Sequence, residues 1–166
     1  MSQDVADFWN QRFSAEDYIY GTAPNDFLAQ HYRQIPVGGR VLSLGEGEGR
    51  NAVFLARQGY QVTAVDAAEQ GLIKIRRLAA QHGVEVATIH ADLEAFCIEP
   101  GQWDGIISIF CHLPASLRQR VNAHIVAGLR PGGVLLLEGY TPRQLQFATG
   151  GPKDTHLLLE PAELQQ

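Results

Sequence analysis

The chain has 166 residues, of which 45% are hydrophobic and 19% charged, and its formal net charge is −5. This length and composition suit a single domain over residues 1–166, and the acidic balance argues against binding of nucleic acid. No apolar run approaches the ~20 residues that cross a bilayer. Residues 1–10 lack the basic segment of a secretory signal, and two cysteines are too few for a disulfide framework, so we expect a cytoplasmic protein that does not bind membranes.

Residues 1–37 are predicted to form a helical appendage or lid. Apolar residues recur there at helical spacing and predict a first short helix: Val5, Phe8, Trp9 and Phe13. Gly21 interrupts the chain, and Thr22 to Pro24 predict the start of a second helix, with Pro24 in its first turn. Three aromatic residues are candidates for a lid over a ligand, with core packing as the alternative: Trp9, Tyr18 and Tyr20.

Strands and helices are predicted to alternate in the rest of the chain, which gives an α/β core over residues 38–166. Five short apolar runs predict the strands: residues 41–44, 60–66, 84–90, 103–110 and 134–138. Several runs are apolar at consecutive positions, as expected for strands that are buried on both faces. We therefore predict a doubly wound, mostly parallel sheet with helices on both sides and a ligand site at the carboxyl ends of its strands.

A glycine cluster, Gly45-Glu46-Gly47-Glu48-Gly49, lies between the first predicted strand and the helix that follows it. Glycines tolerate positive φ and let the backbone approach a ligand closely. Asp66 ends the second predicted strand, where a carboxylate can accept both hydroxyl groups of a ribose. The combination predicts a nucleoside site; the alternative is a tight turn beside a solvated carboxylate.

The spacing of the glycines indicates a cofactor without phosphate. The dinucleotide fingerprint G-x-G-x-x-G would place its last glycine at Arg50. Glu46 and Glu48 would also repel a pyrophosphate at this loop. A nicotinamide-dependent dehydrogenase is therefore disfavoured.

The segment 41–52, Val-Leu-Ser-Leu-Gly-Glu-Gly-Glu-Gly-Arg-Asn-Ala, resembles the first motif of class I methyltransferases that use S-adenosylmethionine. Asp66 matches the acid that ends the second strand of that family, and Asp92 matches the residue that meets the adenine amino group. Segments 103–107 and 129–133 are similar to the motifs of the fourth strand and of the turn before the fifth. Three further segments resemble the tellurite-resistance and thiopurine-methyltransferase branch: residues 8–13, 20–25 and 50–56.

The resemblance implies a Rossmann-like sheet with strand order 3-2-1-4-5, the cofactor S-adenosyl-L-methionine and the product S-adenosyl-L-homocysteine. The implied cofactor-binding residues are Gly45, Glu46, Gly47, Gly49, Asn51, Asp66, Ala67, Asp92, Leu93 and Phe110. Candidate substrate contacts are Tyr20, Arg50, His112 and Arg143. No metal is expected, because Cys97, Cys111 and His112 lack the close spacing of a ligand pair.

The acceptor of the methyl group is expected to be a small molecule. The sequence offers no convincing general base, which favours acceptors that are easily deprotonated: a thiol, a thiopurine-like sulfur, or an oxyanion of selenium or tellurium. A different class of function is the alternative, namely a non-catalytic module that binds S-adenosylmethionine or S-adenosylhomocysteine and lacks a complete substrate site.

Two departures from the family pattern stand out. Ser43 occupies the place of an acid that helps to hold the methionine ammonium group, so Glu46, Glu48 or backbone carbonyls would have to compensate. The family also continues into a C-terminal antiparallel hairpin, which is absent here, so the chain is a short form or a truncated one. Residues 133–138 would then form an edge strand, covered either by residues 156–160 as a substitute strand or by the same edge of a second chain. We favour the homodimer.

Overall fold

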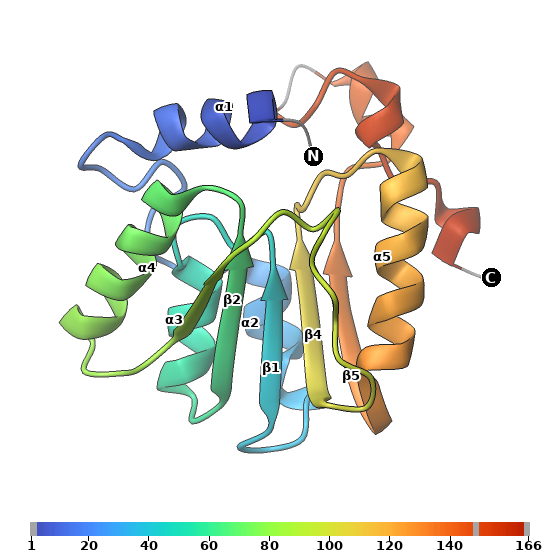
Figure 1. Cartoon of the computed structure of the whole chain (residues 1–166). Helices are drawn as coiled ribbons and strands as arrows, with labels where there is room; N and C mark the ends of the chain where they lie inside the picture. Colours follow the sequence, from blue (N-terminus) through green and yellow to red (C-terminus); the bar gives the residue numbers. More distant parts are fainter. Residues whose placement is uncertain (1–2, 148–149, 165–166) are drawn as a thin grey trace.

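The computed structural model describes residues 3–147 and 150–164. Five strands form one sheet in the order β3 (Ala87–His90), β2 (Gln61–Asp66), β1 (Arg40–Leu44), β4 (Trp103–Ile109) and β5 (Leu129–Glu138), as Figure 1 shows. Every neighbouring pair is parallel. The predicted Rossmann-like architecture and its strand order are confirmed.

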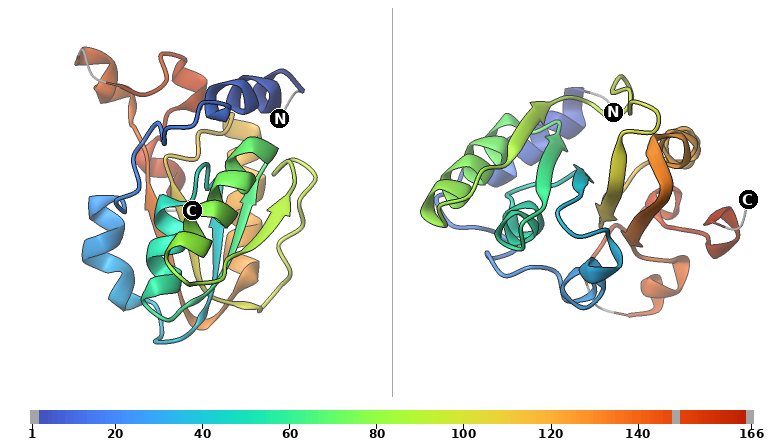
Figure 2. Two further views of the ribbon diagram at one scale, coloured as in Figure 1. Left: turned by 90° about the vertical axis from the view of Figure 1, so that its left-hand side faces the viewer. Right: turned by 90° about the horizontal axis from the view of Figure 1, so that it is seen from below.

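Helices cover both faces of the sheet. They are α2 (Asp26–His31), α3 (Arg50–Arg57), α4 (Glu69–Gln81) and α5 (Ala115–Gly128), while a further helix, α1 (Gln3–Phe13), lies over the strand ends. Val41 of β1 packs in the core cluster that includes α2, α3 and α4, whereas its neighbour Leu42 packs in the cluster that includes α5. Figure 2 shows α5 on the opposite side of the sheet from α2 and α3. Burial on both faces explains the continuous apolar runs of the strands. Across residues 3–147 and 150–164, no helix has the length and apolarity needed to span a membrane.

The first helix, α1, crosses above the carboxyl ends of the strands (Figures 1 and 2). Its Asn10 side chain accepts a hydrogen bond of 3.0 Å from the backbone N–H of Gln70, at the start of α4. Phe13, at the end of α1, is buried, and its ring packs next to Gly47 and Gly71. The first helix of the appendage therefore covers the strand ends, where the ligand site was predicted.

Three predicted boundaries are wrong. The fifth strand begins at Leu129 rather than at residue 134, and its first part pairs with Trp103 before a register irregularity. The other two errors have local reasons. The second helix begins at Asp26 rather than within Thr22–Pro24, because the Asn25 side chain caps it by accepting a 2.9 Å hydrogen bond from the N–H of Leu28. The third strand begins at Ala87 rather than at Val84, because the N–H of Val84 still bonds the Ala79 carbonyl at the end of α4.

After β5 the described residues form three short 3-10 helices, η2 (Pro142–Gln146), η3 (Thr155–Leu157) and η4 (Pro161–Leu164). The substitute strand considered for residues 156–160 does not form, because Asp154 caps η3 by accepting from the N–H of His156. Leu158 is buried nevertheless. Among the described residues nothing pairs with the outer edge of β5, and the homodimer stays a prediction.

Candidate active site

A cavity of about 400 Å³ lies at the carboxyl ends of the strands, beneath α1. The structure brings together eight of the ten residues predicted to bind a cofactor: Gly45, Glu46, Gly47, Asn51, Asp66, Ala67, Leu93 and Phe110. Gly49 and Asp92 do not line the cavity. Gly49 has a φ of 100° at the start of α3, and a Cβ there would lie 3.0 Å from Ile75. The Asp92 carboxylate accepts a 2.8 Å hydrogen bond from the N–H of Glu94.

The loop between β1 and α3 is held in a conformation that suits glycine. Gly45 and Gly47 have φ values of 60° and 70°, in the left-handed region. From the other side the loop meets Gly71 of α4, where a Cβ would lie only 2.4 Å from the Gly47 carbonyl oxygen. The loop and the helix can therefore touch backbone to backbone, and Gly71 is a determinant of the site that sequence reasoning missed.

Asp66 presents a buried carboxylate at the end of β2. One of its oxygens accepts a 2.7 Å hydrogen bond from the N–H of Gly47, and the other accepts a 2.8 Å bond from the N–H of Ala68. Burial raises the pKa of the carboxyl group above its usual value, although these two bonds oppose the shift. A carboxylate has about four lone-pair sites, so Asp66 can still accept from the hydroxyl groups of a ligand.

Glu46 presents a second buried carboxylate in the same cavity. One oxygen accepts from the backbone N–H groups of Asn51 and Ala52, at 3.1 and 2.9 Å, and the other accepts from the Ser43 hydroxyl. All three partners are neutral, and burial raises the pKa of Glu46 to about 7. Ser43 has no acidic group of its own, but its hydroxyl donates to Glu46. The Glu46 carboxylate therefore lies next to the position where the family has an acid.

Glu48 is already paired within the protein. Its carboxylate forms a buried ion pair of 2.6 Å with Lys74 and accepts from the N–H of Ile19 at 2.9 Å. Although Glu48 lines the cavity, its charge is compensated by Lys74. Of the two loop acids considered as a replacement for an acid at position 43, Glu46 has no cationic partner among the residues that the structure describes.

Aromatic rings form the wall next to β4 and β5. Phe110 follows β4 with a φ of 53°, unusual for a residue with a side chain, and its ring centroid lies 4.8 Å from that of Tyr140. Tyr140 also stacks on His112, with centroids 5.8 Å apart and planes at 18°. Burial lowers the pKa of His112, which favours the neutral imidazole, and raises the pKa of the Cys111 thiol to about 12, which excludes a thiolate nucleophile at neutral pH.

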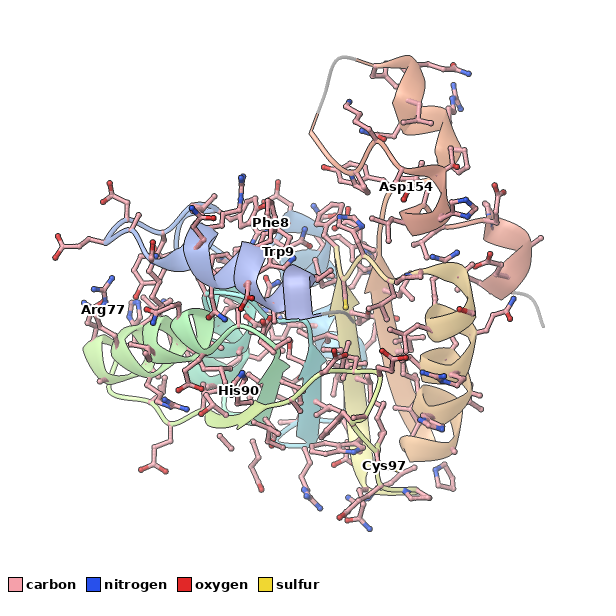
Figure 3. All side chains as sticks on the ribbon, turned by 45° about the horizontal axis from the view of Figure 1, so that its top comes forward. Phe8, Trp9, Arg77, His90, Cys97 and Asp154 are labelled. Carbon is pink, nitrogen blue, oxygen red and sulfur yellow. The ribbon has the colours of Figure 1, made fainter. Side chains whose placement is uncertain are left out.

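The candidate substrate contacts divide into two groups. Tyr20, Arg50 and His112 line the cavity, and the Arg50 guanidinium lies 5.8 Å from the centre of the Tyr20 ring. Arg143 is exposed within η2 and does not line it. In the described part of the chain, no three His, Cys, Asp or Glu side chains gather into a metal site. Cys97, which was considered as a metal ligand, lies well away from α1 with its Phe8 and Trp9 (Figure 3).

Residues 41–133, which include most of β1, the glycine loop, Asp66 and β4, match the family described as "Methyltransferase domain". The chain belongs to this family. One relative of this methyltransferase domain is the ubiquinone biosynthesis O-methyltransferase of Xanthomonas axonopodis pv. citri, with 34% identity over 149 residues, 78% of this chain and 60% of that enzyme. The chain spans about half to three-fifths of the length of the first curated relatives that it matches.

Solved structures share the fold of this methyltransferase domain. One comes from work on the conversion of a disulfide bond into a thioacetal group during echinomycin biosynthesis; it has a TM-score of 0.76, 20% identity, and covers 97% of this chain and 76% of its own. Another is the Haemonchus contortus phosphoethanolamine N-methyltransferase 2 with phosphomonomethylethanolamine and S-adenosylhomocysteine, with a TM-score of 0.62, 26% identity, and 84% and 33% coverage.

The methyltransferase domain also places residues in the cavity that sequence reasoning did not assign to it. Arg12 and Phe13 reach it from α1, and Tyr140 reaches it from just beyond β5. Tyr140 follows the fifth strand by two positions, so its place at a strand end was a usable signal. Arg12 and Phe13 carried no such signal, because only the packing of α1 on α4 brings them to the strand ends.

Proposed function

We propose that this methyltransferase domain binds S-adenosylmethionine in the cavity and transfers its methyl group to a small-molecule acceptor. The observation that carries the proposal is the pair of buried carboxylates, Asp66 and Glu46, in one cavity at the strand ends. Two carboxylates suit a ligand that offers hydroxyl and ammonium donors and no phosphate. The bound S-adenosylhomocysteine of the Haemonchus contortus relative supports the choice of ligand.

The residues of the cavity fit the parts of this cofactor. Asp66 would accept from the ribose hydroxyls, and Glu46 would accept from the methionine ammonium group, with Ser43 and two backbone amides holding its carboxylate in place. Leu93 and Phe110 would pack on the adenine ring. Asp92 would meet the adenine amino group, as the family pattern implies, after an adjustment that brings its side chain to the cavity.

The chain's contribution to the reaction is alignment and exclusion of water. When bound, the cofactor supplies a methyl group on a positively charged sulfur, so the acceptor's lone pair forms the new bond to carbon while the electrons of the broken bond stay on sulfur. The residues of α1 close the cavity from above and limit solvent access. We propose an easily deprotonated acceptor, namely a thiol, a thiopurine-like sulfur or a chalcogen oxyanion; the relative named as an O-methyltransferase adds hydroxyl oxygen to these classes.

Calorimetric titration of the chain with S-adenosylmethionine, S-adenosylhomocysteine and NADH tests the cofactor. We expect both adenosyl ligands to bind and NADH to give no binding heat; the reverse result would overturn the proposal. Transfer of a labelled methyl group to a panel of thiols, phenols and selenite then tests catalysis. Binding without transfer to any acceptor would support the alternative, a non-catalytic module for adenosyl ligands.

A further inference from the structure

A second hollow, of about 590 Å³, adjoins the cofactor cavity. It lies between α1, the segment after β4 and residues 151–157. Five residues line both spaces, which makes them neighbouring compartments: Trp9, Arg12, Tyr20, His112 and Gly151. A molecule in the second hollow would therefore have direct access to the cofactor site at this junction.

The part of the second hollow that lies away from the junction is apolar. Its lining residues there are Val5, Phe8, Pro114, Pro152 and Leu157. Phe8 leaves 54% of its surface exposed and forms an edge-to-face pair with Trp9, with centroids 5.3 Å apart. Figure 3 shows these two side chains side by side on α1. An aromatic pair with one exposed ring, here Phe8, at the edge of a hollow is typical of a surface that receives an apolar ligand.

Polar groups of the second hollow gather at the junction. Tyr20 and His112 lie there, and Arg12 is the single cation among the lining residues that the structure describes. The Arg12 guanidinium lies 5.9 Å from the centre of the Trp9 ring. A small oxyanion needs donors around it to replace its water, and outside the junction this lining offers no donor side chain. A flat apolar molecule with one acidic group needs only one polar end and an apolar remainder.

We propose that the second hollow is the acceptor site and that the acceptor is an aromatic molecule with one hydroxyl or thiol group. Its apolar body lies on Phe8, Trp9 and Leu157, and its nucleophilic atom lies at the junction near Tyr20 and His112. This inference rests on the proposed function, and it narrows the acceptor classes by disfavouring the oxyanions of selenium and tellurium.

Binding of 4-butylphenol to the chain saturated with S-adenosylhomocysteine tests the proposal without any turnover. We expect calorimetry to show binding of 4-butylphenol and none of selenite. Phe8→Ala should lower the affinity for 4-butylphenol by about tenfold. It should leave the affinity for S-adenosylhomocysteine unchanged, since Phe8 lines the second hollow and not the cofactor cavity. The matched control is Phe147→Ala: Phe147 is 52% exposed and lines neither space, so both affinities should stay at the parent values.

The outcomes separate this inference from the proposed function. A chain that binds no S-adenosylhomocysteine overturns both. A chain that binds S-adenosylhomocysteine but not 4-butylphenol, or that binds selenite instead, overturns the acceptor site alone. An equal loss of phenol affinity in Phe8→Ala and Phe147→Ala would also overturn it, because the phenol would then not depend on the second hollow.

Discussion

The two compartments at the strand ends are built in different ways. In the cofactor cavity, the carboxylates of Asp66 and Glu46 are buried and accept hydrogen bonds from nearby backbone N–H groups. Gly47 and Ala68 donate to Asp66, and Ala52 donates to Glu46. In the second hollow, the lining comes from α1, the segment after β4 and residues 151–157, and Phe8 there is half exposed. The first compartment holds buried carboxylates whose places are set by the strand ends, whereas the second has no charged side chain away from the junction and is assembled from distant segments.

This difference separates cofactor chemistry from acceptor choice. The geometry of Asp66 and Glu46 follows from where β1 and β2 end, so it depends on the core of the fold. The position of α1 depends on contacts with segments that are distant in the sequence, such as the buried Phe13 ring beside Gly47 and Gly71 and the hydrogen bond from Gln70 to Asn10. Residues of α1 that line the second hollow but not the cofactor cavity, such as Val5 and Phe8, can therefore change, and with them the acceptor, while Asp66 and Glu46 stay in place.

The largest expected effect comes from placing a side chain at Gly71, where the backbone of α4 touches the backbone of the glycine loop. Gly71→Val should abolish binding of S-adenosylhomocysteine, because a Cβ there would lie 2.4 Å from the Gly47 carbonyl oxygen and would displace the loop. Overpacking of this kind also lowers the free energy of unfolding by about 1–3 kcal/mol. Calorimetry and urea unfolding measure the two effects.

The control for Gly71→Val is Ala80→Val, an exposed position on the same helix. It carries the same β-branched side chain and should cost about 0.5 kcal/mol of stability through helix propensity, with unchanged binding. Parent-like binding by Gly71→Val would mean that α4 does not position the loop.

The next effect separates the two acids of the family pattern. Asp66→Ala should weaken S-adenosylhomocysteine by roughly 10- to 100-fold, since it removes a charged acceptor worth about 1.5–3 kcal/mol. Asp92→Ala should have a smaller effect, because Asp92 does not line the cavity. Titration calorimetry of both variants ranks their losses of affinity for S-adenosylhomocysteine. A larger loss for Asp92→Ala would mean that Asp92, and not Asp66, is the main acidic contact of the ligand.

A smaller effect is expected from pH. Glu46 must be ionised to accept from an ammonium group, and its pKa is about 7 without ligand. As pH falls below 7 the carboxyl group takes up a proton that binding must release, so affinity for S-adenosylhomocysteine should fall by up to about tenfold per pH unit. Glu46→Gln should bind more weakly at pH 8 and lose this dependence, whereas Glu69→Gln, outside the cavity, should keep it. A parent affinity that is flat between pH 5.5 and 8 would exclude Glu46 as the ammonium partner.

The fold was predictable where burial alone decides the structure. Strands buried on both faces appear in the sequence as short apolar runs, and right-handed crossovers then restrict the topology. The errors lie where a local hydrogen bond decides a boundary. Asn25 rather than Pro24 starts α2, because its side chain caps the Leu28 N–H, and Val84 stays bonded to the end of α4 instead of joining β3.

The site was predictable to the extent that it lies at strand ends. Asp66 is the last residue of β2, the glycine loop directly follows β1, and Leu93 lies three residues after β3. Because the carboxyl ends of parallel strands meet at one edge of a sheet, their convergence could be expected from the sequence. Arg12, Phe13 and Gly71 could not be found in this way. Their places depend on how α1 packs on α4, which side-chain contacts between distant segments decide.

The smallest expected effect concerns residues 15–25, which connect the two compartments. Both ends of this segment are held: the Tyr18 ring lies 5.3 Å from Lys74 and 5.2 Å from Arg77, and the Asn25 side chain donates a 2.7 Å hydrogen bond to Glu138. Between them, the N–H of Ile19 donates to Glu48 of the glycine loop. A ligand that fixes the loop should therefore also slow the opening of this segment.

Hydrogen exchange with and without S-adenosylhomocysteine measures this coupling. A ligand at ~100 times its dissociation constant adds at most about 2.7 kcal/mol to any opening that it blocks, so exchange can slow by no more than about 100-fold. We expect a slowing of a few-fold in residues 15–25, because the opening of a segment held by a few contacts only partly disturbs the loop. Residues 115–128, in α5, should show less change because they line neither space. Unchanged exchange in residues 15–25 would make the segment a static support for α1, and the acceptor hollow would then be shaped independently of the cofactor.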